Sequence, residues 1–199
     1  MKTPYAGYDV LGKWRSSSFD DRTRAALHRR LEPPAAPRFF SSEAFADLQA
    51  VVARLFPQED RAEPIPIAAW IDARLSEGLG QGYRHEHMPP EDRAWRLGLA
   101  GIAAEAARQS GRRFADLDPA AQDAVLRAVQ AGETDPARWP EMDPRRFFRD
   151  LLLRVVAALA YAHPASWSEI GFGGPASPRG YVRLGFDERD PWEAQERPG

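Results

Sequence analysis

The residues best suited to chemistry in this sequence form one short run, His85-Glu86-His87. Imidazole nitrogens and carboxylate oxygens are good ligands for zinc or non-haem iron. Ligands that share a helix face lie three or four residues apart, whereas this run falls in an expected loop between Gly82 and Pro89. We therefore interpret it as a solvated polar loop, and keep as an alternative a small metal-binding enzyme that uses these three residues.

A second candidate is the run from Gly171 to Ala176, which has the letters of the dinucleotide-binding pattern G-x-G-x-x-A. That pattern needs a preceding strand and a following helix whose N-terminus faces the pyrophosphate. Here a helix is expected before the glycines, and Pro175 and Pro178 follow them. The run therefore predicts a turn and no nucleotide site.

A third candidate combines Ser166, His163 and Glu169 as nucleophile, base and orienting acid. The three lie too close in sequence, and nothing around them suggests an oxyanion hole or a strained nucleophile turn. The carboxylate pairs Asp20-Asp21 and Glu59-Asp60 are more simply explained as helix-end or surface charges. We therefore predict no catalytic, metal-binding or cofactor-binding residue in this chain.

The composition excludes several other functions. The 199 residues include no Cys, so disulfides, thiolate nucleophiles and iron–sulfur clusters are excluded. The 27 basic and 29 acidic residues leave a formal net charge of −2, which gives no field that would attract nucleic acid. No apolar run approaches the roughly 20 residues of a membrane-spanning helix. The N-terminus lacks the apolar core of a secretory signal, so a cytoplasmic location is expected.

The pattern of apolar residues and helix caps predicts an all-α fold, a single helical domain of about six helices. Asp118-Pro119 and Asp143-Pro144 each place a capping carboxylate before a proline, which is typical of a helix start. Gly111 and Gly132 are expected to end helices. We divide the domain into an N-terminal arm with one short helix (1–41, the helix capped by Ser18), a helical core (42–162), and a Gly/Pro/aromatic C-terminal segment (163–199).

The C-terminal segment carries much apolar surface on a backbone that we expect to be unable to form a helix. Two interpretations remain open. The aromatic side chains fold back over the helical core, or another protein covers part of them, since aromatic and Arg side chains dominate interface hot spots. The aromatic residues concerned are Trp167, Phe172, Tyr181, Phe186 and Trp192.

This segment resembles a known family. Residues 162–175 read AHPASWSEIGFGGP, and PRGY follows at 178–181. Together they are similar to the C-terminal signature of the gluconate 2-dehydrogenase subunit 3 family, the small or gamma subunit. Further similarities occur in the same order along nearly the whole chain. They are PYAGYD at 4–9, PIAAWID at 66–72, GL at 98–99, FADL at 114–117 and the FF pair at 147–148.

The resemblance implies a non-catalytic accessory subunit of a large FAD-dependent dehydrogenase of the glucose-methanol-choline (GMC) oxidoreductase type. Such enzymes oxidise sugars, sugar acids or other alcohols, and a cytochrome c subunit often takes the electrons. Small subunits of this kind help the large subunit to mature, to remain stable or to be exported, and many carry a twin-arginine signal. This chain departs from the family in lacking that signal, so the complex is expected either in the cytoplasm or, after export with a signal-bearing partner, in the periplasm or at a membrane.

We expect the large subunit to bind the signature region, and FAD to belong to that partner. A free-standing protein-interaction scaffold is the remaining alternative. The residues predicted to contact the partner are Trp167, Glu169, Ile170, Phe172, Gly173, Gly174, Pro175, Arg179 and Tyr181.

Overall fold

A computed structural model describes residues 3–32, 36–79, 87–175 and 183–196. Helices make up 59% of the structure, and no strand occurs among the described residues. The predicted all-α class is therefore confirmed. No helix in these ranges combines the length and apolar character that crossing a membrane requires.

The chain divides into two compact units, which we describe separately. The helical unit comprises Pro34–Ala158, and the terminal unit comprises Met1–Pro33 together with Leu159–Gly199. The two ends of the chain therefore belong to the same unit. The predicted segment boundaries after residues 41 and 162 lie eight and four residues beyond the division points after residues 33 and 158.

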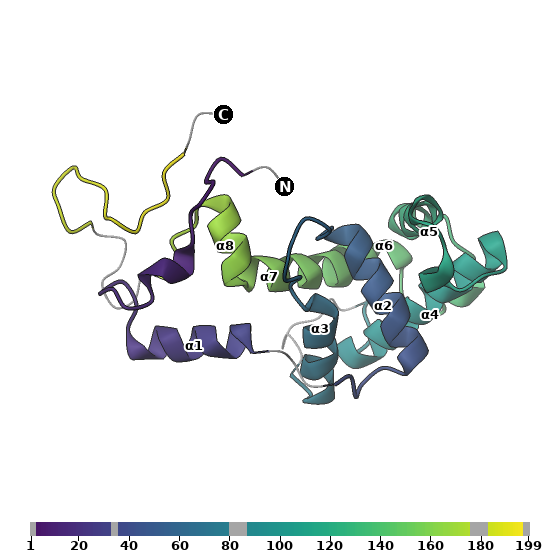
Figure 1. Cartoon of the computed structure of the whole chain (residues 1–199). Helices are drawn as coiled ribbons and strands as arrows, with labels where there is room; N and C mark the ends of the chain where they lie inside the picture. The colour runs from purple at the N-terminus through teal and green to yellow at the C-terminus, as the bar shows by residue number, and fades with distance from the viewer. Residues whose placement is uncertain (1–2, 33–35, 80–86, 176–182, 197–199) are drawn as a thin grey trace. The chain divides into compact units, whose positions relative to one another are not determined.

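The helical unit is built around α2, which contacts three other helices (Figure 1). The Ser41 hydroxyl caps α2 by accepting a hydrogen bond from the Ala44 N–H group. Leu48, Val51 and Val52 on its inner face are buried. The helices that pack together here are α2 (Ser42–Leu55), α3 (Ile67–Ser76), α4 (Glu91–Ser110) and α5 (Pro119–Ala131). The short 3₁₀ turn η2 (Phe114–Asp116) lies between α4 and α5, and η3 (Pro136–Arg138) follows α5.

Two glycines on α4 make room for aromatic rings in the core. A Cβ atom at Gly98 would lie 2.1 Å from the Phe147 ring, and one at Gly101 would lie 2.5 Å from the Trp139 ring. The Phe147 ring also meets Trp95 edge to face, with centroids 6.0 Å apart. The absence of side chains at both glycines therefore allows these rings to pack directly against the helix backbone.

The helix caps predicted from Asp–Pro pairs are confirmed. The Asp118 carboxylate accepts a hydrogen bond from Ala121 N–H, and the Asp143 carboxylate accepts one from Arg145 N–H. Gly111 and Gly132 end α4 and α5 with φ angles of 69° and 75°, which glycine adopts without steric cost.

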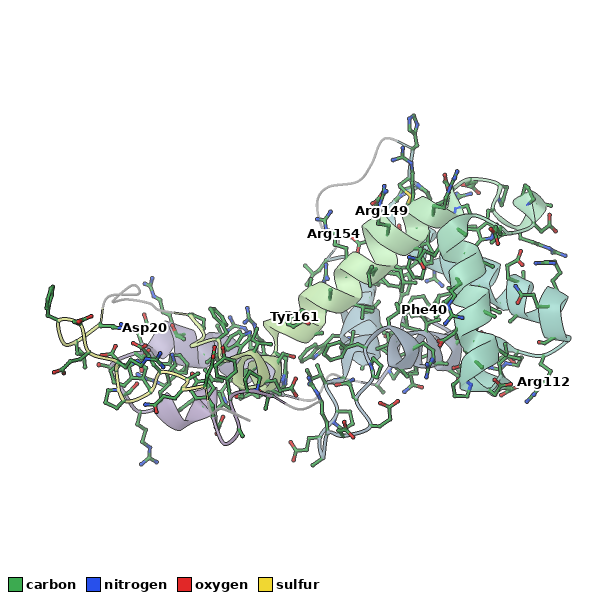
Figure 2. All side chains as sticks on the ribbon, turned by 90° about the horizontal axis from the view of Figure 1, so that it is seen from above. Asp20, Phe40, Arg112, Arg149, Arg154 and Tyr161 are labelled. Atoms are coloured by element: carbon green, nitrogen blue, oxygen red, sulfur yellow. The ribbon has the colours of Figure 1, made fainter. Side chains whose placement is uncertain are left out.

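The helical segment that follows Asp143 widens in its middle. Its buried residues come in pairs four positions apart, at 147–148, 151–152 and 155–156. Residues four positions apart lie on one face of an α-helix and of the wider i→i+5 turns of a π-helix, so all three pairs face the core. The exposed side carries Arg149 and Arg154 (Figure 2). In chain order, the segment consists of α6 (Pro144–Arg146), the π-helix η4 (Phe147–Leu153) and α7 (Arg154–Ala162).

Three buried carboxylates tie loops to the helices of this unit. Asp72 is 1% exposed, and its two oxygens accept hydrogen bonds from three successive backbone N–H groups. The Asp47 and Glu105 carboxylates each accept one hydrogen bond from a backbone N–H group. A buried N–H group without a partner is costly, so these side chains hold the irregular segments in place. The donors are Arg38, Phe39 and Phe40 for Asp72, Ala115 for Asp47 and Asp135 for Glu105.

The terminal unit contains short helices from both ends of the chain. The Asp20 carboxylate caps the first long helix by accepting from Thr23 N–H at 2.7 Å, so the expected cap at Ser18 is wrong. The expectation that the C-terminal segment forms no helix is also wrong, because residues 164–170 are helical. The elements are η1 (Val10–Lys13), α1 (Asp21–Leu31) and α8 (Pro164–Ile170).

Candidate functional site

Residues 163–175, which we call the signature segment, fold as α8 followed by a tight glycine turn. The His163 ring caps α8 by accepting a hydrogen bond from Ala165 N–H through Nδ1. Gly171 ends the helix with a φ angle of 69°, and Phe172 N–H donates back to the Trp167 carbonyl at 2.9 Å. The turn therefore leaves the helix at a fixed angle.

The N-terminal arm lies along the signature segment and hydrogen-bonds to it. The Ser168 hydroxyl accepts from the Val10 N–H group at 3.1 Å. The Lys13 ammonium donates to the Gly173 carbonyl, and the Thr3 hydroxyl donates to the Glu169 carbonyl. These contacts join residues about 160 positions apart in sequence, so the chain itself covers one side of the segment.

Trp167 belongs to the core of the terminal unit. Its side chain is 4% exposed and clusters with Val10, Phe19 and Leu27. Its indole N–H donates to the Tyr161 carbonyl at 2.6 Å, so its polar atom is also satisfied. In the free chain Trp167 is therefore a packing residue. This agrees in part with the interpretation that the aromatic side chains fold back onto their own chain. Trp167 packs against the N-terminal arm instead of the helical core.

The glycines of the turn have different requirements. Gly174 has a φ angle of 72°, and a Cβ atom there would lie 3.1 Å from the Trp167 ring. Gly171 faces the Tyr5 ring, and a Cβ atom at Gly171 would lie 2.6 Å from that ring. Gly173 has no positive φ angle, and its nearest neighbour would be the Lys13 ammonium at 3.6 Å. The backbone conformation therefore favours glycine at positions 171 and 174, but not at position 173.

Two apolar side chains of the signature segment remain exposed. Ile170 is 42% exposed and Phe172 is 38% exposed. The Phe172 ring rests edge-on against Trp167, with centroids 5.6 Å apart, which fixes its direction. Glu169 and Pro175 are half-buried beside them. The predicted contacts Arg179 and Tyr181 lie outside the described residues.

The arrangement does not suit the hydrolytic or nucleotide sites considered from the sequence. The Ser166 side chain is 1% exposed, and His163 uses Nδ1 to cap α8, so a substrate has no access to the serine. The glycine turn follows the carbonyl end of α8, where the partial charge is negative. A phosphate group needs the opposite end of a helix.

The described residues contain no group of three or more His, Cys, Asp or Glu side chains that could hold a metal ion. His87 is exposed, whereas His85 and Glu86 lie outside the described residues. The metal-binding alternative at these three positions therefore stays a prediction.

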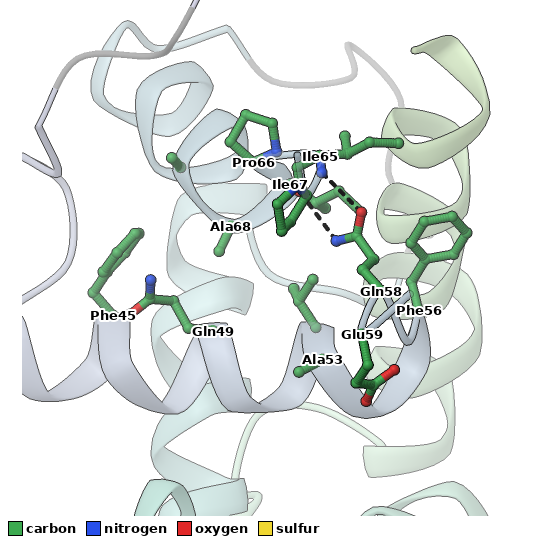
Figure 3. Close-up of a pocket in the computed structure, with 13 residues that line it drawn as sticks. Phe45, Gln49, Ala53, Phe56, Gln58, Glu59, Ile65, Pro66, Ile67 and Ala68 are labelled. Atoms are coloured by element: carbon green, nitrogen blue, oxygen red, sulfur yellow. Dashed lines mark hydrogen bonds between the residues drawn. The ribbon is translucent and has the colours of Figure 1, made fainter. Parts of the chain in front are cut away.

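The helical unit carries an open groove of about 470 Å³ that the sequence did not suggest. It lies between α2 and the segment that leads into α3, and apolar side chains such as Phe45, Phe56 and Ile65 line it (Figure 3). The Gln58 amide braces its wall by exchanging two hydrogen bonds with the Ile65 backbone. Among the described residues that line this groove, Glu59 alone is ionisable, so they provide no acid–base pair.

Comparison with known families identifies the type of chain. The family described as gluconate 2-dehydrogenase subunit 3 matches residues 42–174, which is more than half of the sequence and includes α8 and the glycine turn through Gly174. The chain belongs to this family, as the signature suggested. No curated protein and no solved structure matches it.

Proposed function

We propose that this chain is a non-catalytic accessory subunit that binds and stabilises a large FAD-dependent dehydrogenase of the GMC type. The partner oxidises a sugar, a sugar acid or another alcohol, and it holds the FAD. Membership of a dehydrogenase-subunit family is the observation that carries this proposal. A cytochrome c subunit that accepts the electrons fits the same assembly.

The surface of the signature segment supports a docking role. Ile170 and Phe172 present apolar surface to solvent on a turn whose conformation is already set by the N-terminal arm. Such side chains contribute most when a partner buries them fully, and a preformed turn lowers the entropic cost of binding. The fixed polar groups around them serve the fold, because they bond to the arm or cap α8.

The test is co-production of the tagged chain with its flavin-dependent dehydrogenase. The wild-type chain should retain the large subunit with its FAD. Ile170→Ala and Phe172→Ala should each weaken binding by roughly 2 kcal/mol, about thirtyfold in dissociation constant, if each is an anchor.

Leu31→Ala is the matched control, because Leu31 is 39% exposed on the same unit but outside the signature segment. It should leave binding unchanged. Failure of the wild-type chain to bind any flavoprotein, or substrate oxidation by the isolated chain, would overturn the proposed function.

A further inference from the structure

Residues 183–196 form an irregular loop whose backbone is held by polar contacts at its base. The buried Asp190 carboxylate accepts a hydrogen bond from Leu184 N–H at 2.8 Å. Glu193 accepts one from Asp190 N–H, and it also receives two hydrogen bonds from the Arg183 guanidinium at 2.9 and 3.0 Å. These hydrogen bonds join residues 183–184 to residues 190–193. They therefore hold together the two sides of the turn at residues 184–188, which we call the tip.

The loop is also fixed internally and to the N-terminal arm. The Tyr5 hydroxyl donates to Glu196 at 3.2 Å. Within the tip, Asp187 has a φ angle of 55°, and a Cβ atom at Gly185 would lie 2.8 Å from a Glu188 carboxylate oxygen. The tip is therefore a tight turn that leaves little space between its backbone and its own side chains.

This ordered tip exposes its apolar side chains. Phe186 is fully exposed and Leu184 is 64% exposed. Burial of such side chains is favourable, and the free chain does not gain that free energy here. Ordering a flexible loop on binding costs conformational entropy, and a loop that is already ordered loses less entropy when it binds. The tip therefore has the properties of a docking element.

Charges beside the apolar side chains indicate the kind of surface that would receive them. Asp187 and Glu188 are both exposed and follow Phe186 directly. Arg189 is exposed after them, while Arg183 is engaged by Glu193 at the base. Two adjacent carboxylates disfavour an anionic lipid surface and favour an apolar pocket with a rim of Lys or Arg side chains.

We propose that Leu184 and Phe186 form a second anchor, which inserts into an apolar pocket with a basic rim on the dehydrogenase subunit. This inference rests on the proposed function and adds a contact site beyond the signature segment. The tip lies outside residues 42–174, so the family match itself does not indicate it.

The experiment measures the dissociation constant between the purified FAD-containing large subunit and the full chain. Phe186→Ala should weaken binding at least tenfold, and Leu184→Ala severalfold, because the first removes more buried area. Asp187→Asn, which keeps a residue type tolerant of positive φ, should weaken binding a few-fold at low salt and reduce its salt dependence.

Leu79→Ala is the control, since Leu79 is 57% exposed but lies in the helical unit. It should bind like the wild-type chain. All four variants should keep the wild-type helix content and unfolding midpoint, because each substituted residue is exposed in the free chain.

The outcomes separate this inference from the proposed function. Wild-type affinity of Phe186→Ala, with Ile170→Ala and Phe172→Ala still weakened, would overturn the anchor and leave the proposed function intact. No binding by the wild-type chain would overturn both. Loss of self-association by Phe186→Ala, or of its binding to phosphatidylglycerol vesicles, with unchanged affinity for the large subunit, would assign the tip to another occupant and overturn the anchor.

Discussion

The helical unit and the terminal unit achieve order in different ways. In the helical unit, long helices bury rings such as Trp95 and Phe147 completely, and carboxylates such as Asp72 hold the loops. The terminal unit has a small core around Trp167, and hydrogen bonds between the two chain ends hold much of the rest. Its large apolar side chains are also more exposed, with Phe186 as the extreme. The difference supports the proposal that the terminal unit carries the docking surfaces, with the helical unit as their scaffold.

The largest expected effect comes from removing the centre of the terminal unit. Trp167→Ala should cost about 3–5 kcal/mol, because a buried indole and its contacts with Val10 and Phe19 are lost. Denaturant unfolding measures the loss, and limited proteolysis should show cleavage in the N-terminal arm. Phe172→Ala, at a side chain 38% exposed, should cost far less. Equal stability of the two variants would mean that Trp167 does not organise the unit.

The helical unit is tested by two neighbouring leucines. Leu152 is completely buried, whereas Leu153 is 39% exposed on the same π-helical turn. Leu152→Ala should cost about 2–5 kcal/mol through lost burial and a cavity, and Leu153→Ala less than about 1 kcal/mol. Thermal melting followed by far-ultraviolet circular dichroism distinguishes them. Similar melting temperatures would contradict the placement of this face in the core.

The glycine turn provides a smaller and more local test. Gly174→Ala should destabilise the terminal unit by roughly 1–2 kcal/mol, because residue 174 has a left-handed backbone and faces the Trp167 ring. Gly173→Ala should be nearly neutral, since position 173 lacks a positive φ angle. Hydrogen exchange at the amides of α8 reports the difference. The reverse order of effects would show that the turn adopts another conformation.

The smallest effect concerns a carboxylate in the helical unit. Burial raises the pKa of Asp47 above its usual value of 3.8, while the hydrogen bond from Ala115 N–H opposes the rise. A raised pKa means that the folded state favours the protonated carboxyl group. This preference stabilises the fold fully below the usual pKa, and the stabilisation is lost as the pH rises through the raised pKa.

Asp47→Asn keeps an oxygen acceptor for Ala115 N–H and removes the charge. The variant should be slightly more stable than wild type at neutral pH, by less than about 1 kcal/mol, and its advantage should shrink as pH falls toward 3.8. Urea unfolding at several pH values provides the measurement. A variant that is less stable at neutral pH would show that the charged hydrogen bond outweighs burial.

Local sequence signals explain the parts of the fold that could be predicted. The Asp118-Pro119 and Asp143-Pro144 starts and the stops at Gly111 and Gly132 each depend on neighbouring residues only, and the structure confirms them. The start of α8 uses a similar arrangement, a capping His163 before Pro164. It was missed because the glycines and prolines that follow suggested an irregular segment.

The candidate site could be predicted only in part, because its structure depends on contacts between distant residues. Nothing local indicates that the Val10 amide meets the Ser168 hydroxyl across 158 positions. The packing of the N-terminal arm against the signature segment buries Trp167, whereas Ile170 and Phe172 stay exposed. The sequence identified the segment by its composition but could not separate packing residues from exposed ones.

The most direct test of the central claim is hydrogen exchange of the wild-type chain, free and bound to its flavin-dependent dehydrogenase. We predict that binding slows exchange in the signature segment at residues 168–174 and in the tip at residues 184–188. Exchange in α2, α4 and α5 of the helical unit should remain nearly unchanged. Protection confined to the helical unit, for example around the groove beside Phe45 and Phe56, would contradict the assignment of the terminal unit as the docking unit.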